Sequence, residues 1–281
     1  MIPARQPRPH GAMVLAVTSG KGGVGKTNVA INVAVALARL GYRVGVLDAD
    51  FGLGNVDVLL GLTPESHIGH LLSGEKSLHE IVVTGPCGVQ VLPASSGLQA
   101  LTALTDAQRE RLRDAIGEMC HELDFLLIDT ATGLSDNVMT MLGASERVMV
   151  VTSLEPSAIV DAYAVIKVLS TTSPDTEIGL VINTVRDADE AGLAFRQLDV
   201  AATRFLNRHL VFYGFIPEDP AVREAVLVQR AIVDHLPQAP ASRSFRILAF
   251  RVASFGHTPR GQQLAAARKG AAQLREVSQC A

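Results

Sequence analysis

Residues 20–27 have the sequence Gly20-Lys21-Gly22-Gly23-Val24-Gly25-Lys26-Thr27, which matches the phosphate-binding loop spacing G-x-x-x-x-G-K-[ST]. Glycines lack a Cβ, so the backbone N–H groups of such a loop can close around phosphate oxygens. In this motif Lys26 reaches the β- and γ-phosphates and the Thr27 hydroxyl binds Mg²⁺. The loop therefore predicts a nucleotide phosphate site with Mg²⁺.

The segments on either side of the loop fit the same motif. The apolar run at 13–17 predicts a strand, and residues 28–37 predict a helix. Strand, loop and helix is the order that the motif requires, and the helix would direct its positive end at the anion. The alternative is a glycine-rich turn without a ligand, and this context argues against it.

Composition bounds the class of protein. The chain has 281 residues, 48% of them hydrophobic, and a net charge of −3, which is typical of one large α/β domain and gives no general reason to expect DNA as a partner. Cys87, Cys120 and Cys280 form no C-x-x-C pair, which argues against a zinc, disulfide or cluster site. With no apolar run long enough for a bilayer, we expect a cytoplasmic protein.

Apolar runs alternate with segments of helical period, as expected for a parallel sheet covered on both faces. We predict an α/β fold with a doubly wound, mainly parallel sheet of about seven or eight strands. The strands are predicted at residues 13–19, 43–48, 89–92, 125–129, 147–152, 178–183 and 210–216, with 81–83 as a weaker edge candidate.

Helices are predicted between these strands, and some of their ends can be assigned. Gly41 is expected in a left-handed conformation after the first helix, and Asp106 is expected to be the N-cap of the second. We divide the chain into a flexible leader, one domain and a tail. The predicted helices span 27–40, 107–121, 157–170, 189–206, 242–255 and 261–278, and the three parts span 1–12, 13–256 and 257–281.

Two strands end in acidic residues at the edge where open α/β sheets bind ligands. Asp48 and Asp50 follow the run 44–47, and Asp129 follows 125–128. A carboxylate after four apolar strand residues is costly unless a cation compensates it, and Mg²⁺ beside Thr27 would do so. We assign Thr27, Asp48 and Asp129 to the metal, and Asp50 to the orientation of the attacking water.

Each of these assignments has a structural alternative. Asp129 could be the N-cap of a helix that begins after Gly133. Asp50 could be a turn residue before Gly52. Both alternatives need only backbone N–H partners, so the three-dimensional contacts of the two carboxylates decide between them.

The stretch Lys21–Thr27, K-G-G-V-G-K-T, resembles the signature of the deviant Walker A ATPases, the MinD/ParA family. The resemblance implies binding of ATP and ADP. In that family the early lysine, here Lys21, reaches across an ATP-sandwiched dimer to the partner's phosphates, which implies an ATP-dependent homodimer and a catalytic role for Lys21. The alternative is a solvated loop lysine.

The resemblance covers about residues 13–250 and favours one branch of the family. Residues 48–61, DADFGLGNVDVLLG, and 155–163, EPSAIVDAY, resemble the flagellar number regulators of the FlhG (FleN) type. This implies a role in the number and placement of flagella. The implied partners are the signal-recognition-type GTPase FlhF, C-ring proteins and a flagellar transcription activator.

Two late segments, 182–186 and 214–219, are similar to the family's adenine and ribose contacts. Asn183 and Asp219 would hold the base, and a side-chain amide suits this because it can donate to and accept from a purine edge. The alternatives are that Asn183 only ends a strand and that Asp219 caps a helix. The residues that the resemblance adds to the nucleotide site are Asn183, Arg186, Pro217, Glu218 and Asp219.

The sequence also departs from the family pattern. Where the family has D-[ST]-[GAP]-A-G, residues 129–133 are DTATG, and the branched Thr132 implies slower hydrolysis or an altered switch. The leader lacks the D-Q-A-x-x-L-R element with which many FlhG proteins stimulate their GTPase. The remaining alternatives are a nucleotide-locked scaffold with little turnover and a ParA-type DNA-segregation ATPase.

The tail bears on membrane binding. Members of this branch commonly end in an amphipathic helix that holds the ATP-bound dimer on the membrane. Here residues 262–275 carry mostly alanine at the apolar positions, and alanine buries little area. We expect a solvated terminal helix, with weak association of the dimer at the inner membrane face as the alternative.

Overall fold

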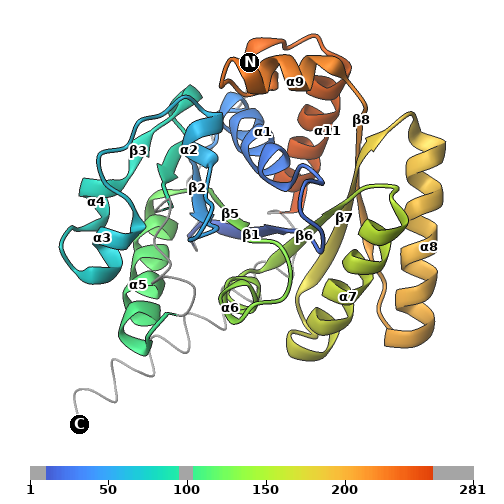
Figure 1. Cartoon of the computed structure of the whole chain (residues 1–281), viewed down its shortest axis with the longest axis horizontal. Helices are drawn as coiled ribbons and strands as arrows, with labels where there is room; N and C mark the ends of the chain where they lie inside the picture. Colours follow the sequence, from blue (N-terminus) through green and yellow to red (C-terminus); the bar gives the residue numbers. More distant parts are fainter. Residues whose placement is uncertain (1–10, 95–103, 256–281) are drawn as a thin grey trace.

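The computed structural model describes residues 11–94 and 104–255. Residues 1–10 of the predicted leader and the predicted tail, with its helix at 261–278, lie outside these ranges. The described chain forms an eight-stranded sheet in the order β3-β4-β2-β5-β1-β6-β7-β8, with helices on both faces (Figure 1). Neighbouring strands run parallel except for β3 and β4. The predicted doubly wound α/β fold is confirmed.

The strands follow the predicted positions closely, with one correction. Ile81 was expected in an edge strand but ends the short helix α4 (Leu78–Ile81), which a capping box between Ser77 and Glu80 begins. The edge strand lies just beyond and pairs antiparallel with β4. The strands are β1 (Met13–Thr18), β2 (Val44–Ala49), β3 (Val83–Thr84), β4 (Gln90–Leu92), β5 (Phe125–Thr130), β6 (Arg147–Thr152), β7 (Glu177–Val185) and β8 (Val211–Pro217).

The five predicted helices of the domain are present. Gly41 has φ +85° after α1, as predicted. Asp106 is not the N-cap of α5: Thr105 is, because its Oγ1 accepts from the Gln108 N–H while the Gln108 carboxamide accepts from the Thr105 N–H. The remaining helical segments are α1 (Lys26–Arg39), α2 (Val56–Leu59), α3 (Ile68–Ser73), η1 (Pro86–Gly88), α5 (Asp106–Glu122), α6 (Asp136–Gly143), α7 (Pro156–Thr172), α8 (Ala188–Leu206), α9 (Pro220–Leu227), α10 (Ile232–His235) and α11 (Pro240–Phe255).

The core has two layers, one on each face of the sheet. Along β1, Val14 and Ala16 face the layer under α5 to α8, whereas Leu15 and Val17 face the layer under α1 and α11. Because both faces are covered, the central strands are apolar throughout. Across residues 11–94 and 104–255, no helix is long and apolar enough to cross a membrane.

Candidate nucleotide-binding site

The glycine-rich loop connects the carboxyl end of β1 to α1. Gly23 and Gly25 have φ values of +82° and +86°, which glycine adopts without strain. A Cβ on Gly22 or Gly23 would meet no atom of the described residues within 4 Å, so the loop borders open space. The first turn of α1 contains no acidic residue. Its N–H groups and positive end are therefore suited to an anion.

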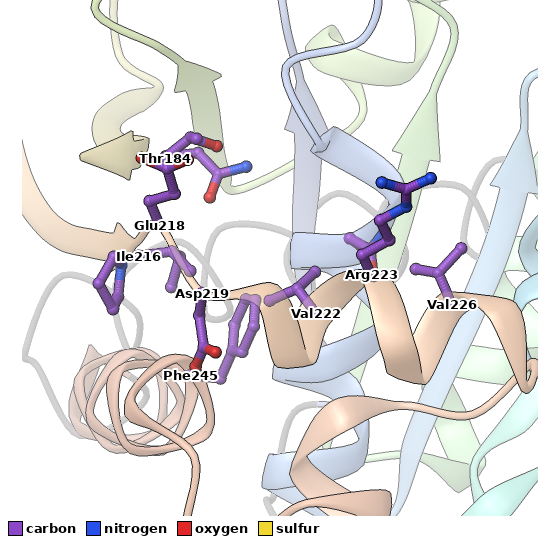
Figure 2. Close-up of a pocket in the computed structure, with 11 residues that line it drawn as sticks. Thr184, Ile216, Glu218, Asp219, Val222, Arg223, Val226 and Phe245 are labelled. Atoms are coloured by element: carbon purple, nitrogen blue, oxygen red, sulfur yellow. The ribbon is translucent and has the colours of Figure 1, made fainter. Parts of the chain in front are cut away.

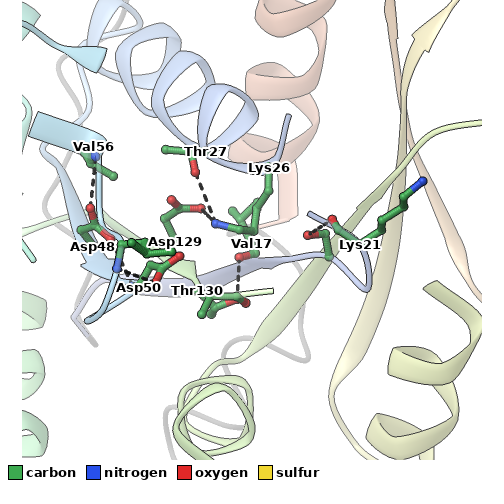
Figure 3. A network of polar contacts seen from close by, with 12 residues as sticks. Val17, Lys21, Lys26, Thr27, Asp48, Asp50, Val56, Asp129 and Thr130 are labelled. Carbon is green, nitrogen blue, oxygen red and sulfur yellow. Dashed lines mark hydrogen bonds and ion pairs between the residues drawn. The ribbon is translucent and has the colours of Figure 1, made fainter. Parts of the chain in front are cut away.

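Lys26 lies against Asp129 at the base of the loop. Its Nζ is 2.6 Å from Asp129 Oδ1 and 3.3 Å from Thr27 Oγ1 (Figure 3). The two charged side chains are only 7% and 2% exposed. Burial raises the pKa of Asp129, although the adjacent Lys26 opposes the rise. The carboxylate thus depends on a neighbouring cation.

Asp48 lies beside Asp129, since the two residues are partners in the β2–β5 register. Its two oxygens accept from the N–H groups of Asp50 and Val56, each at 3.1 Å. Burial, and then the charge of Asp129, raise the pKa of Asp48 to about 7. Two buried carboxylates beside the Thr27 hydroxyl are oxygen donors of the kind that Mg²⁺ prefers. These oxygen donors therefore suit the predicted Mg²⁺, whose positive charge would offset the repulsion between the two buried carboxylates.

The structural alternatives for the two acids have different outcomes. Asp129 is not a helix N-cap, because α6 is capped by Ser135, whose Oγ accepts from Val138 N–H. Asp50 Oδ1 accepts from Leu53 N–H at 3.2 Å, so it does make the contact of a turn residue. Its role with water stays a prediction.

Lys21 is directed away from Lys26 (Figure 3). Its Nζ donates to the Glu155 carboxylate and, at 2.9 Å, to Ser157 Oγ, and its side chain is 34% exposed. The P-loop and the start of α7 are therefore in contact through this lysine. The contact is closer still at Gly20, where a Cβ would overlap the backbone of Asp161.

A cavity of about 350 Å³ lies between the ends of β7 and β8 and helices α1, α9 and α11 (Figure 2). Of the predicted base and ribose residues, Arg186 is not among the described residues that line it, and its side chain, 80% exposed, pairs with Glu190. Asn28, Val222 and Phe245 lie outside the predicted segments 182–186 and 214–219, and only the fold brings them to this cavity. The lining residues are Asn28, Asn183, Thr184, Ile216, Pro217, Glu218, Asp219, Val222, Arg223, Val226 and Phe245.

The two residues expected to hold the base bond to backbone groups. Asp219 accepts from the N–H groups of Ala221 and Ala241, both at 3.0 Å, so it caps α9 as the alternative proposed. Asn183 Nδ2 donates to the Val24 carbonyl at 2.8 Å. Contacts from either side chain to a base stay predictions.

Comparisons with known proteins agree with this site. A family model described as ParA, NUBPL iron-transfer P-loop NTPase, matches residues 11–253. The antiactivator FleN of Pseudomonas aeruginosa is 42% identical over 88% of each chain. The flagellum site-determining protein YlxH of Helicobacter pylori is 35% identical over 82% of this chain and 78% of its own. The septum site-determining protein MinD of Pyrococcus horikoshii, solved with Mg-ADP, has a TM-score of 0.75 and 25% identity over 88% of this chain and 98% of that one.

The chain belongs to the ParA/MinD family of P-loop NTPases, and it is an ATPase of that family. Within the family it is similar to the antiactivator FleN, as residues 48–61 and 155–163 predicted, and to the flagellum site-determining protein YlxH. The MinD structure contains Mg-ADP, the ligand class to which the P-loop, Thr27 and the two buried carboxylates are suited.

Proposed function

We propose that this ATPase is a dimerisation switch that regulates flagellar number and placement, and that Mg²⁺-dependent hydrolysis of ATP resets it. The observation that carries the proposal is the different engagement of two lysines in one loop. Lys26 pairs with Asp129 inside its own site, whereas Lys21 pairs with Glu155 and Ser157 outside it. In the proposed dimer, Lys21 exchanges its contacts with Glu155 and Ser157 for a second copy's phosphates.

Apolar side chains around the site support a dimer face. Leu53 is 80% exposed, Leu134 41% and Val160 65%. They follow Asp50, the end of β5 and Glu155 along the chain, so they belong to segments that supply an acid of the site or contact the phosphate loop. Apolar side chains gathered around a polar site are typical of a surface that another protein covers. Mg²⁺ would supply positive charge to the phosphates, and Asp48, Asp129 and Thr27 would hold it.

The flagellar part of the proposal rests on the similarity to FleN and YlxH. We propose that the ATP-bound dimer acts on an FlhF-type GTPase, C-ring proteins and a flagellar transcription activator. It would do so in the cytoplasm, and weak association of the dimer at the inner membrane face is the alternative. In this proposal, binding of ATP and Mg²⁺ forms the dimer, and the partners bind only the dimer.

The deciding measurement is the solution mass by light scattering with ADP–Mg²⁺ and with ATP–Mg²⁺, with phosphate release followed in parallel. We expect ATP alone to double the mass and phosphate to appear slowly. Lys21→Ala should bind ATP and stay monomeric, whereas Asp50→Ala should dimerise without turnover. Lys167→Ala, which removes an exposed lysine of α7, is the matched control and should behave as wild type.

Each other outcome has a defined meaning. A wild-type monomer in both nucleotides, or a Lys21→Ala dimer, would contradict the switch. Doubling without phosphate release would favour the nucleotide-locked scaffold. For the flagellar role, the number of flagella per cell should change when a P. aeruginosa strain lacking FleN receives this chain, and should not change with Lys21→Ala.

A further inference from the structure

We propose that Asn183 is a positioning residue for the phosphate loop: its carboxamide fixes the peptide unit between Val24 and Gly25, so that the Gly25 N–H is held toward the phosphates. This assigns Asn183 a task on the phosphate side of the site in addition to any contact with a base. The inference requires nucleotide binding and does not depend on dimerisation.

The contact joins two distant parts of the chain. Asn183 lies near the carboxyl end of β7, and its Nδ2 donates to the Val24 carbonyl of the loop at 2.8 Å. Val24 is almost fully buried. A Cβ on Gly25 would overlap Nδ2, so the carboxamide approaches the loop as closely as a glycine permits.

Because of the geometry of the peptide bond, the hydrogen bond to the Val24 carbonyl also orients the Gly25 N–H. A trans peptide unit is planar, so its C=O and N–H groups point in opposite directions, and the described chain contains no cis peptide bonds. A hydrogen bond that holds the Val24 carbonyl therefore also sets the direction of the Gly25 N–H. Gly25, at φ +86° and without a Cβ, would otherwise allow this unit to rotate.

Asn183 itself is held rigidly. The next residue, Thr184, is β-branched and has φ +57°, a strained conformation that persists only where surrounding structure enforces it. The β7–β8 register shifts at this point, and Glu218 N–H donates to the Val185 carbonyl at 2.8 Å. Strain of this kind is typical of ligand clamps. The sheet therefore presents the carboxamide to the loop from a fixed position.

The position of Gly25 predicts an effect on chemistry as well as on binding. During phosphoryl transfer, negative charge builds on the β-phosphate oxygens of the leaving ADP. A hydrogen bond from a preoriented N–H donor strengthens as this charge grows. Loss of Asn183 should therefore lower kcat. A residue that contacts only the base would instead raise KM and leave kcat unchanged.

The test uses a ligand that has no base. Binding of Mg²⁺–tripolyphosphate is measured by calorimetry, together with kcat and KM for ATP. Asn183→Ala should weaken tripolyphosphate binding by about three- to tenfold, as expected for one hydrogen bond, and should lower kcat. Asn183→Asp keeps the shape of the side chain but places a carboxylate beside the Val24 carbonyl. The losses of tripolyphosphate affinity and of kcat should therefore be larger than in Asn183→Ala.

The matched control is Lys167→Ala, which removes an exposed side chain of α7 outside both the cavity and the phosphate loop. It should leave tripolyphosphate affinity, KM and kcat at the wild-type level. Thermal unfolding without nucleotide confirms that each variant is folded. Wild-type kcat in Asn183→Asp would overturn the proposal, as would unchanged tripolyphosphate affinity, and neither result would bear on the dimer switch.

Discussion

The two halves of the nucleotide site are built on different principles. In the phosphate half, the loop with Asp48 and Asp129, buried Lys26 pairs with Asp129, and the buried Asp48 beside them adds an acid that this pair does not neutralise (Figure 3). The base half is the cavity at the ends of β7 and β8 (Figure 2). There Asn183 and Asp219 bond to backbone groups of the protein. Side-chain charge therefore defines the phosphate half, and the positions of loops and helices define the base half.

The largest effect should follow Lys26→Ala, which removes the cation of the phosphate half. The buried Asp129 carboxylate would lose its partner, at a cost on the order of 3 kcal/mol in unfolding free energy. Affinity for ATP should fall more than about tenfold, because a charge-assisted contact is lost. Urea unfolding and calorimetry measure the two losses.

The control is the double variant Lys26→Ala/Asp129→Asn. It should recover much of the unfolding free energy because no unpaired charge stays buried, but it should not recover ATP affinity. If the single variant were as stable as wild type, the buried pair would not be the organising interaction of the phosphate half.

The next effect tests whether the halves are separate. Gly25→Ala places a Cβ at φ +86° and against Asn183 Nδ2, so we expect a loss of about 1–3 kcal/mol in unfolding free energy. Combined with Asn183→Ala, the loss should be less than additive, since the overlap disappears. Gly22→Ala, where a Cβ has open space, is the control for stability. Full additivity would mean that the halves do not communicate through this contact.

Asp219→Ala should have a smaller effect, confined to the base half. Two N–H groups, of Ala221 and Ala241, lose their acceptor, and a lost cap costs about 1–2 kcal/mol. Asp219→Asn keeps one acceptor oxygen, so its Tm should lie between the Tm of the wild-type protein and that of Asp219→Ala. If instead Asp219→Asn lost ATP affinity at unchanged stability, contact with the base would be its main task.

The fold was predictable where periodicity is strong and less so where elements are short. The apolar runs gave the positions of the strands, since a sheet covered on both faces requires them. Helices α2, α3, α4 and α10 have four to six residues, too few for a helical period. At α5, Thr105 and Asp106 are both capping types, and the spacing to Gln108 decided for Thr105.

The same distinction applies to the site. The phosphate half could be predicted because its motif is contiguous and because acids after apolar strands need a cation. The residues of the base half became predictable only through resemblance; the cap that Asp219 makes on α9 was foreseen as an alternative, whereas the contact of Asn183 with the phosphate loop was not. Asn183 and Val24 are 159 positions apart, so no local pattern could pair them. The left-handed conformation of Thr184 likewise follows from the register shift between β7 and β8.

The smallest effect concerns pH at α3, whose first N–H bonds to Pro93 just beyond β4. His67 Nδ1 accepts from Gly69 N–H at 3.1 Å, and His70 Nδ1 accepts from His67 N–H at 3.2 Å. Both rings must be neutral to accept. Burial, and then the adjacent His70, lower the pKa of His67, although Glu75 opposes this.

Because the folded protein holds the pKa of His67 below its unfolded value of about 6.5, this contribution to stability is present above that pH and is lost as pH falls through the folded value. His67→Asn keeps an acceptor at the cap and cannot titrate. Between pH 8 and pH 5 the Tm of this variant should therefore fall about 2 °C less than the Tm of the wild-type protein. His79→Asn removes an exposed histidine that pairs with Glu118 and is the control. An equal fall in wild type and His67→Asn would show that the cap of α3 does not depend on pH, and the acid sensitivity would then have to come from elsewhere in the fold.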